Sequence, residues 1–140
     1  MVNTPVYAEA EEVMDLVRDP SKQPGKDYVI VDVRGEDYKG GHIPGAINVP
    51  ANEMYDKAND LISEYSQVPK IYFHCALSQV RAGPKSARIY AETLNNLGTE
   101  TDQKVKILRF GFEGWHDKYS KEKDLIEDYD EAFWLSEYRS

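Results

Sequence analysis

The chain has 140 residues, 41% of them hydrophobic, which is enough to build one domain, residues 1–140, around a buried core. Its 25 acidic and 17 basic side chains give a net charge of −8, which argues against binding to nucleic acid phosphates. Its single cysteine excludes an internal disulfide and a cysteine-rich zinc site, and favours a reducing compartment, the cytoplasm or the nucleus. We expect no metal. We also expect no membrane partner, because no apolar run approaches the roughly 20 residues that cross a bilayer.

Helices and strands alternate in the first half of the sequence. Apolar residues at helical spacing predict a helix over 9–19. The β-branched run YVIVDV predicts a strand over 28–33 that is buried on both faces, and AINV predicts a short strand over 46–49. A second helix is expected over 52–65, with Asn52 as its N-terminal cap.

The same alternation continues in the second half. KIYFHC predicts a strand over 70–75, the following segment predicts a helix over 83–98, and VKILRF predicts a strand over 105–110 that GFEGW ends. The acidic and aromatic stretch 120–140 is expected to form a helix and a tail whose aromatic side chains pack back onto the domain. This order predicts an α/β fold with a central parallel sheet flanked by helices, in which ligands bind at the carboxyl ends of strands.

The loop HCALSQVRAGP, residues 74–84, carries the chemistry that the sequence suggests most strongly. It lies between a predicted strand and a predicted helix, where backbone N–H groups and the helix N-terminus attract an anion. Such surroundings favour the thiolate form of a cysteine, which makes Cys75 a candidate nucleophile. Arg81 follows after five intervening residues and offers a planar fork suited to a tetrahedral oxyanion. The pair predicts attack by sulfur on a phosphate-like centre, followed by hydrolysis of the intermediate.

The competing interpretation is that Cys75 is only a small apolar residue packed at the end of a strand. The context favours catalysis, because a strand, a loop without charged residues before its arginine, and a helix occur in order. Ser78 lies in the middle of the loop, where its hydroxyl is able to donate to the thiolate or to an oxyanion. The expected substrate-binding residues are those of the loop: Ala76, Leu77, Ser78, Gln79, Val80 and Arg81.

Four other polar positions have structural interpretations that compete with catalytic ones. Asp32 and Arg34 are expected to form an ion pair or cap at a strand end rather than to take part in catalysis. His42 is expected to bond to the backbone, since no second ligand lies at metal spacing. His74 is expected to support the neighbouring cysteine. Glu113, within GFEGW, is the first position to test as a general acid.

Three stretches, in this order, resemble the signatures of rhodanese-fold domains. VDVRGEDYKGGHIPGAINVP is similar to their first signature, and GFEGW is similar to their last. HCALSQVRAGP resembles the active loop of the cell-division-cycle 25 dual-specificity phosphatases and of the related eukaryotic arsenate reductases. The likeness covers about residues 5–119, leaving 120–140 as a C-terminal helix and tail, and it looks most like the small stand-alone fungal or plant members.

The resemblance implies a rhodanese fold and assigns roles in the loop. Cys75 matches the family's nucleophile, Arg81 matches its oxyanion-binding arginine, and His74 matches the residue before the nucleophile. A loop that ends in arginine after five residues is typical of the phosphatase and arsenate reductase branch, whereas sulfurtransferases have a shorter loop. The sequence departs from the family pattern at Ala82, which stands between the arginine and Gly-Pro.

These features together predict a cysteine-dependent protein phosphatase that acts on phosphotyrosine, with dual specificity as an extension. The alternative is an arsenate reductase, which needs glutathione and glutaredoxin because the chain has no second cysteine. Thiosulfate sulfur transfer and a non-catalytic rhodanese-like binding module are the remaining alternatives. The expected partner is a phosphoprotein or a small oxyanion, no cofactor is expected beyond glutathione as co-substrate, and the oligomeric state is left open.

Overall fold

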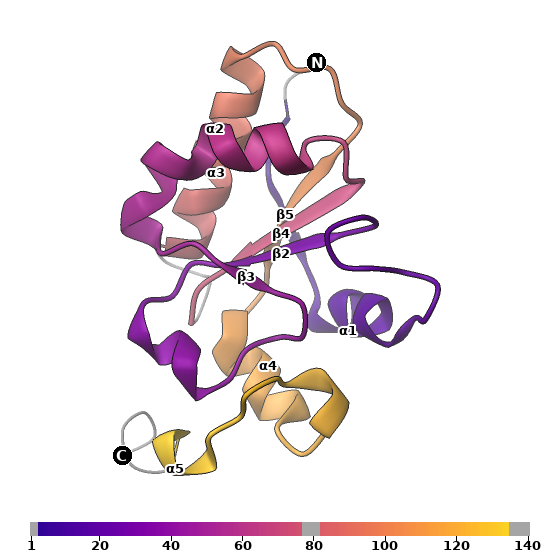
Figure 1. Ribbon diagram of the computed structural model, residues 1–140, viewed down its shortest axis with the longest axis vertical. Coiled ribbons are helices and arrows are strands. Elements are labelled where there is room, and N and C mark those ends of the chain that lie inside the picture. Colours follow the sequence, from indigo (N-terminus) through magenta and orange to yellow (C-terminus); the bar gives the residue numbers. More distant parts are fainter. Residues whose placement is uncertain (1–2, 77–81, 135–140) are drawn as a thin grey trace.

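A five-stranded parallel sheet forms the centre of the protein, and helices cover both of its faces (Figure 1). The computed structural model describes residues 3–76 and 82–134, apart from the side chains of Glu36 and Asp37. The strands lie in the order β1-β5-β4-β2-β3, and every pairing between them is parallel. This arrangement confirms the predicted α/β class. The strands are β1 (Val6–Ala8), β2 (Val29–Asp32), β3 (Ile47–Asn48), β4 (Lys70–His74) and β5 (Lys104–Leu108).

The helices lie in two layers, with α2 and α3 on one face of the sheet and α1 and α4 on the other. None of the helices within 3–76 and 82–134 has both the length and the apolarity needed to cross a membrane. The α-helices are α1 (Ala10–Arg18), α2 (Met54–Tyr65), α3 (Ala82–Asn96), α4 (Gly111–Tyr119) and α5 (Glu131–Phe133). Three short 3-10 helices accompany them: η1 (Glu36–Gly40), η2 (Ala51–Glu53) and η3 (Lys123–Leu125).

The two faces of the sheet bury alternate side chains of the same strands. Val31 and Phe73 belong to the cluster that α2 and α3 cover. Ile30 and Tyr72 belong to the cluster on the opposite face, which α1 and α4 cover. Successive side chains of a strand point to opposite faces, so a strand covered on both sides needs apolar residues at every position. This explains why the sequence shows continuous rather than alternating apolar runs.

The structure corrects two of the predictions for the first half of the chain. Asn52 does not cap α2, because it lies inside the turn of η2, and Glu53 occupies the cap position. The edge strand β1 is absent from the sequence prediction. Its three residues are apolar but form a run shorter than those of the central strands, and two of them are exposed. The remaining predicted elements before residue 76 are found, with each end within two residues of its predicted position.

The second half of the chain differs more from the prediction. GFEGW was expected to end a strand, but it forms the first turn of α4, where Phe112 and Trp115 are buried one helical turn apart. Its two glycines are poor helix formers, which hides the helix from sequence patterns. Of the helix and tail expected in 120–140, the described residues 120–134 contain two short helices, η3 and α5.

The segment that follows α4 packs against the core. Leu125, Ile126 and Trp134 belong to the buried cluster beneath α1 and α4. The Trp134 indole stacks on His116 with the ring centroids 4.2 Å apart, and its Nε1 donates to the Gly40 carbonyl at 2.9 Å. The expected packing of the aromatic tail is therefore confirmed at Trp134, while Tyr138 lies outside the described residues.

Candidate active site

Cys75 lies directly after β4, at the carboxyl edge of the parallel sheet, where ligands bind in open α/β folds. The residue is half-buried and packs against the core cluster of α2 and α3. Its carbonyl oxygen accepts hydrogen bonds from the Phe112 backbone N–H and from Nδ1 of His74, each at 2.9 Å. His74 thus holds the backbone of the nucleophile candidate, while its support of a reaction at Cys75 stays a prediction.

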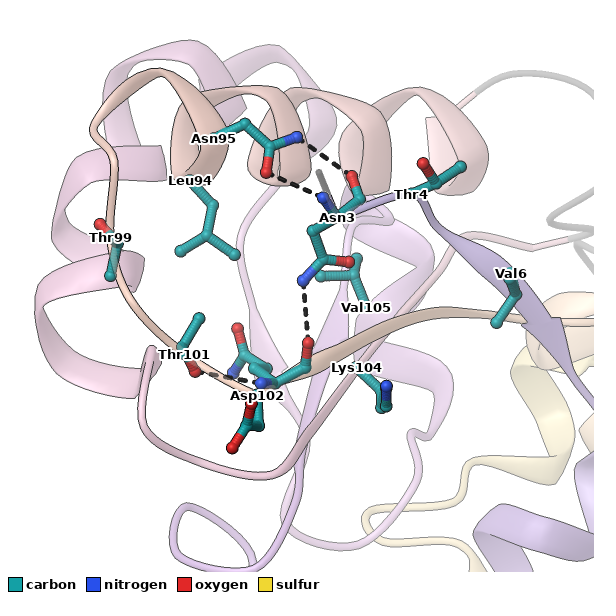
Figure 2. A pocket seen from close by; sticks show the side chains of 11 residues that line it. Asn3, Thr4, Val6, Leu94, Asn95, Thr99, Thr101, Asp102, Lys104 and Val105 are labelled. Carbon is teal, nitrogen blue, oxygen red and sulfur yellow. Dashed lines mark hydrogen bonds between the residues drawn. The ribbon is translucent and has the colours of Figure 1, made fainter. Parts of the chain in front are cut away.

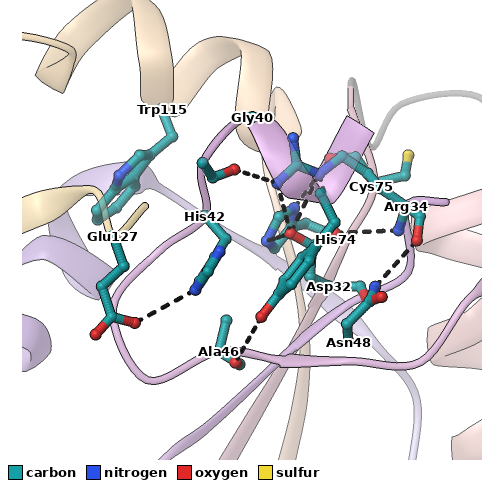
Figure 3. Close-up of polar contacts among 12 residues, drawn as sticks. Asp32, Arg34, Gly40, His42, Ala46, Asn48, His74, Cys75, Trp115 and Glu127 are labelled. Carbon is teal, nitrogen blue, oxygen red and sulfur yellow. Dashed lines mark hydrogen bonds and ion pairs between the residues drawn. The ribbon is translucent and has the colours of Figure 1, made fainter. Parts of the chain in front are cut away.

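A buried ion pair lies beneath this point of the sheet (Figure 3). Asp32 ends β2, and its register partner in β4 is His74. The Asp32 carboxylate accepts from Nε of Arg34 at 3.0 and 3.1 Å and from an Nη of Arg34 at 2.8 Å. The side chains are 0% and 1% exposed. The predicted structural ion pair is confirmed. It forms the floor of the site.

The charges of this floor favour the carboxylate form of Asp32. Burial by itself would raise the pKa of Asp32, but the charges of His74 and Arg34 and the hydrogen bonds from Arg34 outweigh burial and hold that pKa below its usual value. Nε2 of His74 lies 3.7 Å from the Asp32 carboxylate. Because Nδ1 faces a carbonyl oxygen, which only accepts, Nδ1 carries a proton.

Four further contacts join the floor to neighbouring segments. The Asn48 side-chain amide at the end of β3 donates to the carbonyls of Asp32 and Arg34 at 2.9 and 3.0 Å. The guanidinium of Arg34 donates to the Gly41 carbonyl at 2.7 Å and lies over the ring of Phe112 at 4.1 Å. Sequence reasoning missed Asn48. Its only signal was its place at the end of a short predicted strand.

The start of α4 forms the wall behind the nucleophile candidate. The Phe112 and Glu113 amides donate to the carbonyls of Cys75 and Ala76 at 2.9 and 2.8 Å. Gly111 has φ +56, and a Cβ placed on it would lie 2.5 Å from both carbonyl oxygens. Only glycine fits there. Glu113, the acid candidate, is half-buried in this first helical turn rather than in a strand-end loop, and its protonation role stays a prediction.

The rest of the predicted loop lies outside the described residues. This holds for Leu77, Ser78, Gln79, Val80 and Arg81, so their predicted roles stay predictions. Ala82, the departure from the family pattern, is the first residue of α3, and the helix continues without a break through Gly83 and Pro84. In the described residues α3 therefore begins one residue before its predicted start at Gly83.

His42 binds its neighbours within the fold. Its backbone N–H and carbonyl pair with Glu127 at 3.0 and 2.8 Å, and its ring stacks on Tyr38 at 4.2 Å. Its Nε2 lies 3.4 Å from a Glu127 carboxylate oxygen. The predicted bonding of the His42 ring to the backbone is not found among the described residues, since Nε2 faces a carboxylate and the buried Nδ1 has no hydrogen-bond partner there. Within 3–76 and 82–134, no group of three or more histidine, cysteine or acidic side chains is placed to hold a metal ion.

Two cavities lie at opposite ends of the sheet. The larger, about 440 Å³, opens at the amino ends of β1 and β5, where Asn95 accepts from and donates to the backbone of Asn3 (Figure 2). The side chains of Asn3, Asn95 and Thr101 in its lining already bond to backbone groups of other lining residues. The cavity is distant from the carboxyl edge that carries Cys75. A smaller cavity of about 280 Å³ lies between η2 and the start of α3, lined by Tyr55 and Lys85 among others.

Known proteins of related sequence share this arrangement of elements. The model of the Rhodanese-like domain matches residues 9–118. The chain is 34% identical over 113 residues to the dual specificity phosphatase ibp1 of Schizosaccharomyces pombe, covering 70% of this chain and 81% of that protein. It is 31% identical over 111 residues to Arsenate reductase 2.2 of Oryza sativa subsp. japonica, covering 78% of this chain and 80% of that protein.

Two solved structures extend the comparison. The As-Sb reductase from Leishmania major has a TM-score of 0.68 and 28% identity, covering 88% of this chain and 85% of that one. Ygr203w, a yeast protein tyrosine phosphatase of the rhodanese family, has a TM-score of 0.72 at 21% identity, covering 96% and 99%, and shows the fold alone. The chain therefore belongs to the rhodanese-like domain family, and its homologues within that family are Cdc25-like phosphatases and arsenate reductases.

Proposed function

We propose that this protein is a cysteine-dependent phosphatase that acts on phosphotyrosine. The observation that carries the proposal is the position of Cys75 at the carboxyl edge of the sheet, with its carbonyl held by Phe112 and His74 above a buried ion pair. A nucleophile whose backbone is fixed from two sides loses little freedom on binding substrate. The 34% identity to a dual specificity phosphatase supports the same reaction class.

The proposed reaction has two displacement steps. The Cys75 thiolate attacks phosphorus, an S–P bond forms, and the P–O bond to the tyrosine oxygen breaks. That oxygen takes a proton, either from Glu113 or from the substrate monoanion. Water then attacks phosphorus, the S–P bond breaks, and inorganic phosphate leaves with the thiolate restored. Arg81 is assigned to the phosphoryl oxygens because a guanidinium fork matches two of them at once.

Arsenate reduction is the second candidate, supported by the 31% identity to an arsenate reductase and the 28% identity to an As-Sb reductase. Arsenate is a tetrahedral oxyanion like phosphate, so Cys75 would form an S–As(V) bond on the same site as one arsenate oxygen leaves as water. One glutathione thiol then bonds to the Cys75 sulfur, the S–As bond breaks with two electrons passing to arsenic, and arsenite leaves. A second glutathione thiol releases the Cys75 thiolate and forms glutathione disulfide. With one cysteine in the chain, the thiols must come from outside.

The experiment measures three reactions side by side on the wild type and on Cys75→Ser. These are phosphate release from a phosphotyrosine peptide, arsenite formation with glutathione and glutaredoxin, and thiocyanate formation from thiosulfate and cyanide. We expect phosphate release that Cys75→Ser abolishes. Arsenite formation without phosphate release favours the second candidate, and thiocyanate formation favours sulfur transfer. No activity in any assay identifies a binding module and overturns the proposal.

Variants of two arginines test the assignment of the phosphoryl-binding group. Arg81→Lys keeps the charge but loses the fork, and we expect kcat/KM to fall by roughly 10²- to 10³-fold. Arg88→Lys is the matched control, since Arg88 is exposed on α3. An equal effect of the two changes contradicts the role of Arg81.

Glu113→Gln tests the general acid. We expect kcat/KM to fall about 10²-fold for a substrate with a poor leaving group and to change little for p-nitrophenyl phosphate, whose leaving group needs no proton.

A further inference from the structure

Phe110 has a backbone conformation that its side chain disfavours. It lies between β5 and α4 with φ 66° and ψ 3°, in the left-handed region. A large side chain is uncommon there, since its Cβ crowds the backbone. The other non-glycine residue with positive φ in the described chain is Asp128, whose short polar side chain tolerates this region. Phe110 is the exception that needs a reason.

The conformation itself is required by the candidate active site. The turn at Phe110 redirects the chain so that Gly111 contacts the Cys75 and Ala76 carbonyls and the next two amides donate to them. Glycine at position 110 would make this turn without steric cost. The fold therefore explains the turn but not the phenylalanine.

Core packing does not explain the phenylalanine either. The residue is 50% exposed, and it stands outside both buried clusters. Its Cβ lies against Gly114, one turn along α4. The preceding residue, Arg109, is engaged elsewhere, because its guanidinium pairs with Glu9 at 2.8 Å and lies over the Tyr7 ring at 4.7 Å. Phe110 is left as a half-exposed aromatic residue that directly precedes Gly111, whose backbone lies against the Cys75 carbonyl. Strained residues of this kind cluster at functional sites.

We propose that Phe110 is a specificity-determining residue that packs against the aromatic ring of a phosphotyrosine substrate while Cys75 attacks its phosphorus. This rests on the proposed phosphatase function. An aromatic pair stabilises a complex only where the substrate has an aryl group, so phosphoserine and arsenate gain nothing from it. Phe110 thus favours phosphotyrosine over small oxyanions, although Cys75 and Arg81 treat all of these substrates alike.

The experiment compares Phe110→Ala, Phe110→Gly and Phe110→Tyr with the wild type. We expect kcat/KM for a phosphotyrosine peptide to fall about tenfold in Phe110→Ala and Phe110→Gly, mainly through KM, and to return in Phe110→Tyr. Activity on a phosphoserine peptide and on arsenate should stay within about twofold. Equal losses on all substrates, or no loss on any, overturn the proposal.

Two measurements separate this proposal from its alternatives. The urea midpoint of Phe110→Ala should equal that of the wild type, and Phe110→Gly should not be less stable than Phe110→Ala. A large loss of stability would make the ring a packing element and overturn the proposal. Binding of the phosphotyrosine peptide to Cys75→Ser, with and without Phe110→Ala, needs no turnover. If the wild type shows no phosphatase activity, the proposed function fails, but the binding measurement still tests Phe110. A Kd for the phosphotyrosine peptide that is tenfold weaker in the double variant than in Cys75→Ser supports the role of Phe110. An equal Kd in the two proteins overturns it.

Discussion

Two arginine–aspartate pairs of the same length lie in opposite surroundings. Arg34 and Asp32 form a 2.8 Å pair beneath Cys75 with side chains 1% and 0% exposed, and Arg18 and Asp124 form a 2.8 Å pair between α1 and η3 with side chains 40% and 59% exposed. Water and salt screen the outer pair, so it contributes little. The inner pair has no water to replace a lost partner. The buried pair therefore fixes the geometry of its surroundings, whereas the exposed pair contributes little to the structure.

The inner pair has this effect because it joins separate segments. Arg34 reaches the Gly41 carbonyl and the ring of Phe112, and Phe112 in turn donates to Cys75. Asp32 faces His74, which bonds to the same Cys75 carbonyl. A change in the buried pair is thus transmitted to the nucleophile candidate through contacts alone. The outer pair has no such route to the site.

The largest expected effect is that of Arg34→Met. Removing the guanidinium leaves the Asp32 carboxylate buried without its main partner, which costs about 3–5 kcal/mol of unfolding free energy. Urea unfolding measures this loss, and Arg18→Met, which should barely move the midpoint, is the matched control. If both variants lose the same amount, the contrast between the pairs is wrong. Arg34→Met combined with Asp32→Leu should recover part of the loss, since no buried charge remains.

The next largest loss of stability is expected for Gly111→Ala, with Gly98→Ala as its control. Gly111→Ala places a Cβ against two carbonyls at φ +56, whereas Gly98→Ala has φ +65 and nothing within 4 Å of its new Cβ. The conformational penalty is common to both, but only Gly111→Ala adds overpacking, for a total of about 2–4 kcal/mol. We expect Gly111→Ala to lose activity as well as stability, and Gly98→Ala to keep full kcat. Loss of kcat in Gly98→Ala would contradict this.

The third prediction concerns how the stability of the protein depends on pH through Asp32. The pKa of Asp32 and the pKa of Asp124 are both lowered in the folded protein, so each stabilises it above its unfolded pKa near 4, and that contribution is lost as the pH falls further. The stability gap between wild type and Asp32→Asn should hold from pH 7 to about pH 5 and narrow below pH 4. In about 1 M NaCl, that gap should persist. A gap that closes in salt at neutral pH contradicts burial as the cause.

The smallest expected effect is that of salt on the outer pair. Asp124→Asn at pH 7 should cause a slight loss of stability in low salt and none in about 1 M NaCl, where the screening length is about 3 Å. Urea midpoints at the two salt concentrations measure this directly. Activity should be unchanged under both conditions, because Arg18 and Asp124 have no contact with the floor of the site. A salt-independent loss would show that the carboxylate does more than pair with Arg18.

Sequence reasoning predicted the candidate site but not the contacts by which the fold holds it in place. The strand before Cys75, the helix after it and the structural ion pair of Asp32 and Arg34 were predicted and are found. The helix that begins at Gly111 was missed, because glycines argue against a helix unless a neighbouring backbone requires them. That neighbour lies some 35 positions away in the sequence. Local patterns do not register such a contact.

The sequence by itself determined the class of fold and the residues that are candidates for its chemistry. Continuous apolar runs fix strands that are covered on both faces, and a cysteine followed by an arginine after five residues fixes the candidate for oxyanion chemistry. Only the tertiary structure decided which groups hold Cys75 in place. Phe112, His74 and the Asp32–Arg34 pair come from three separate segments, and hydrogen bonds act over about 3 Å. Their meeting depends on strand order and register, which no local pattern contains.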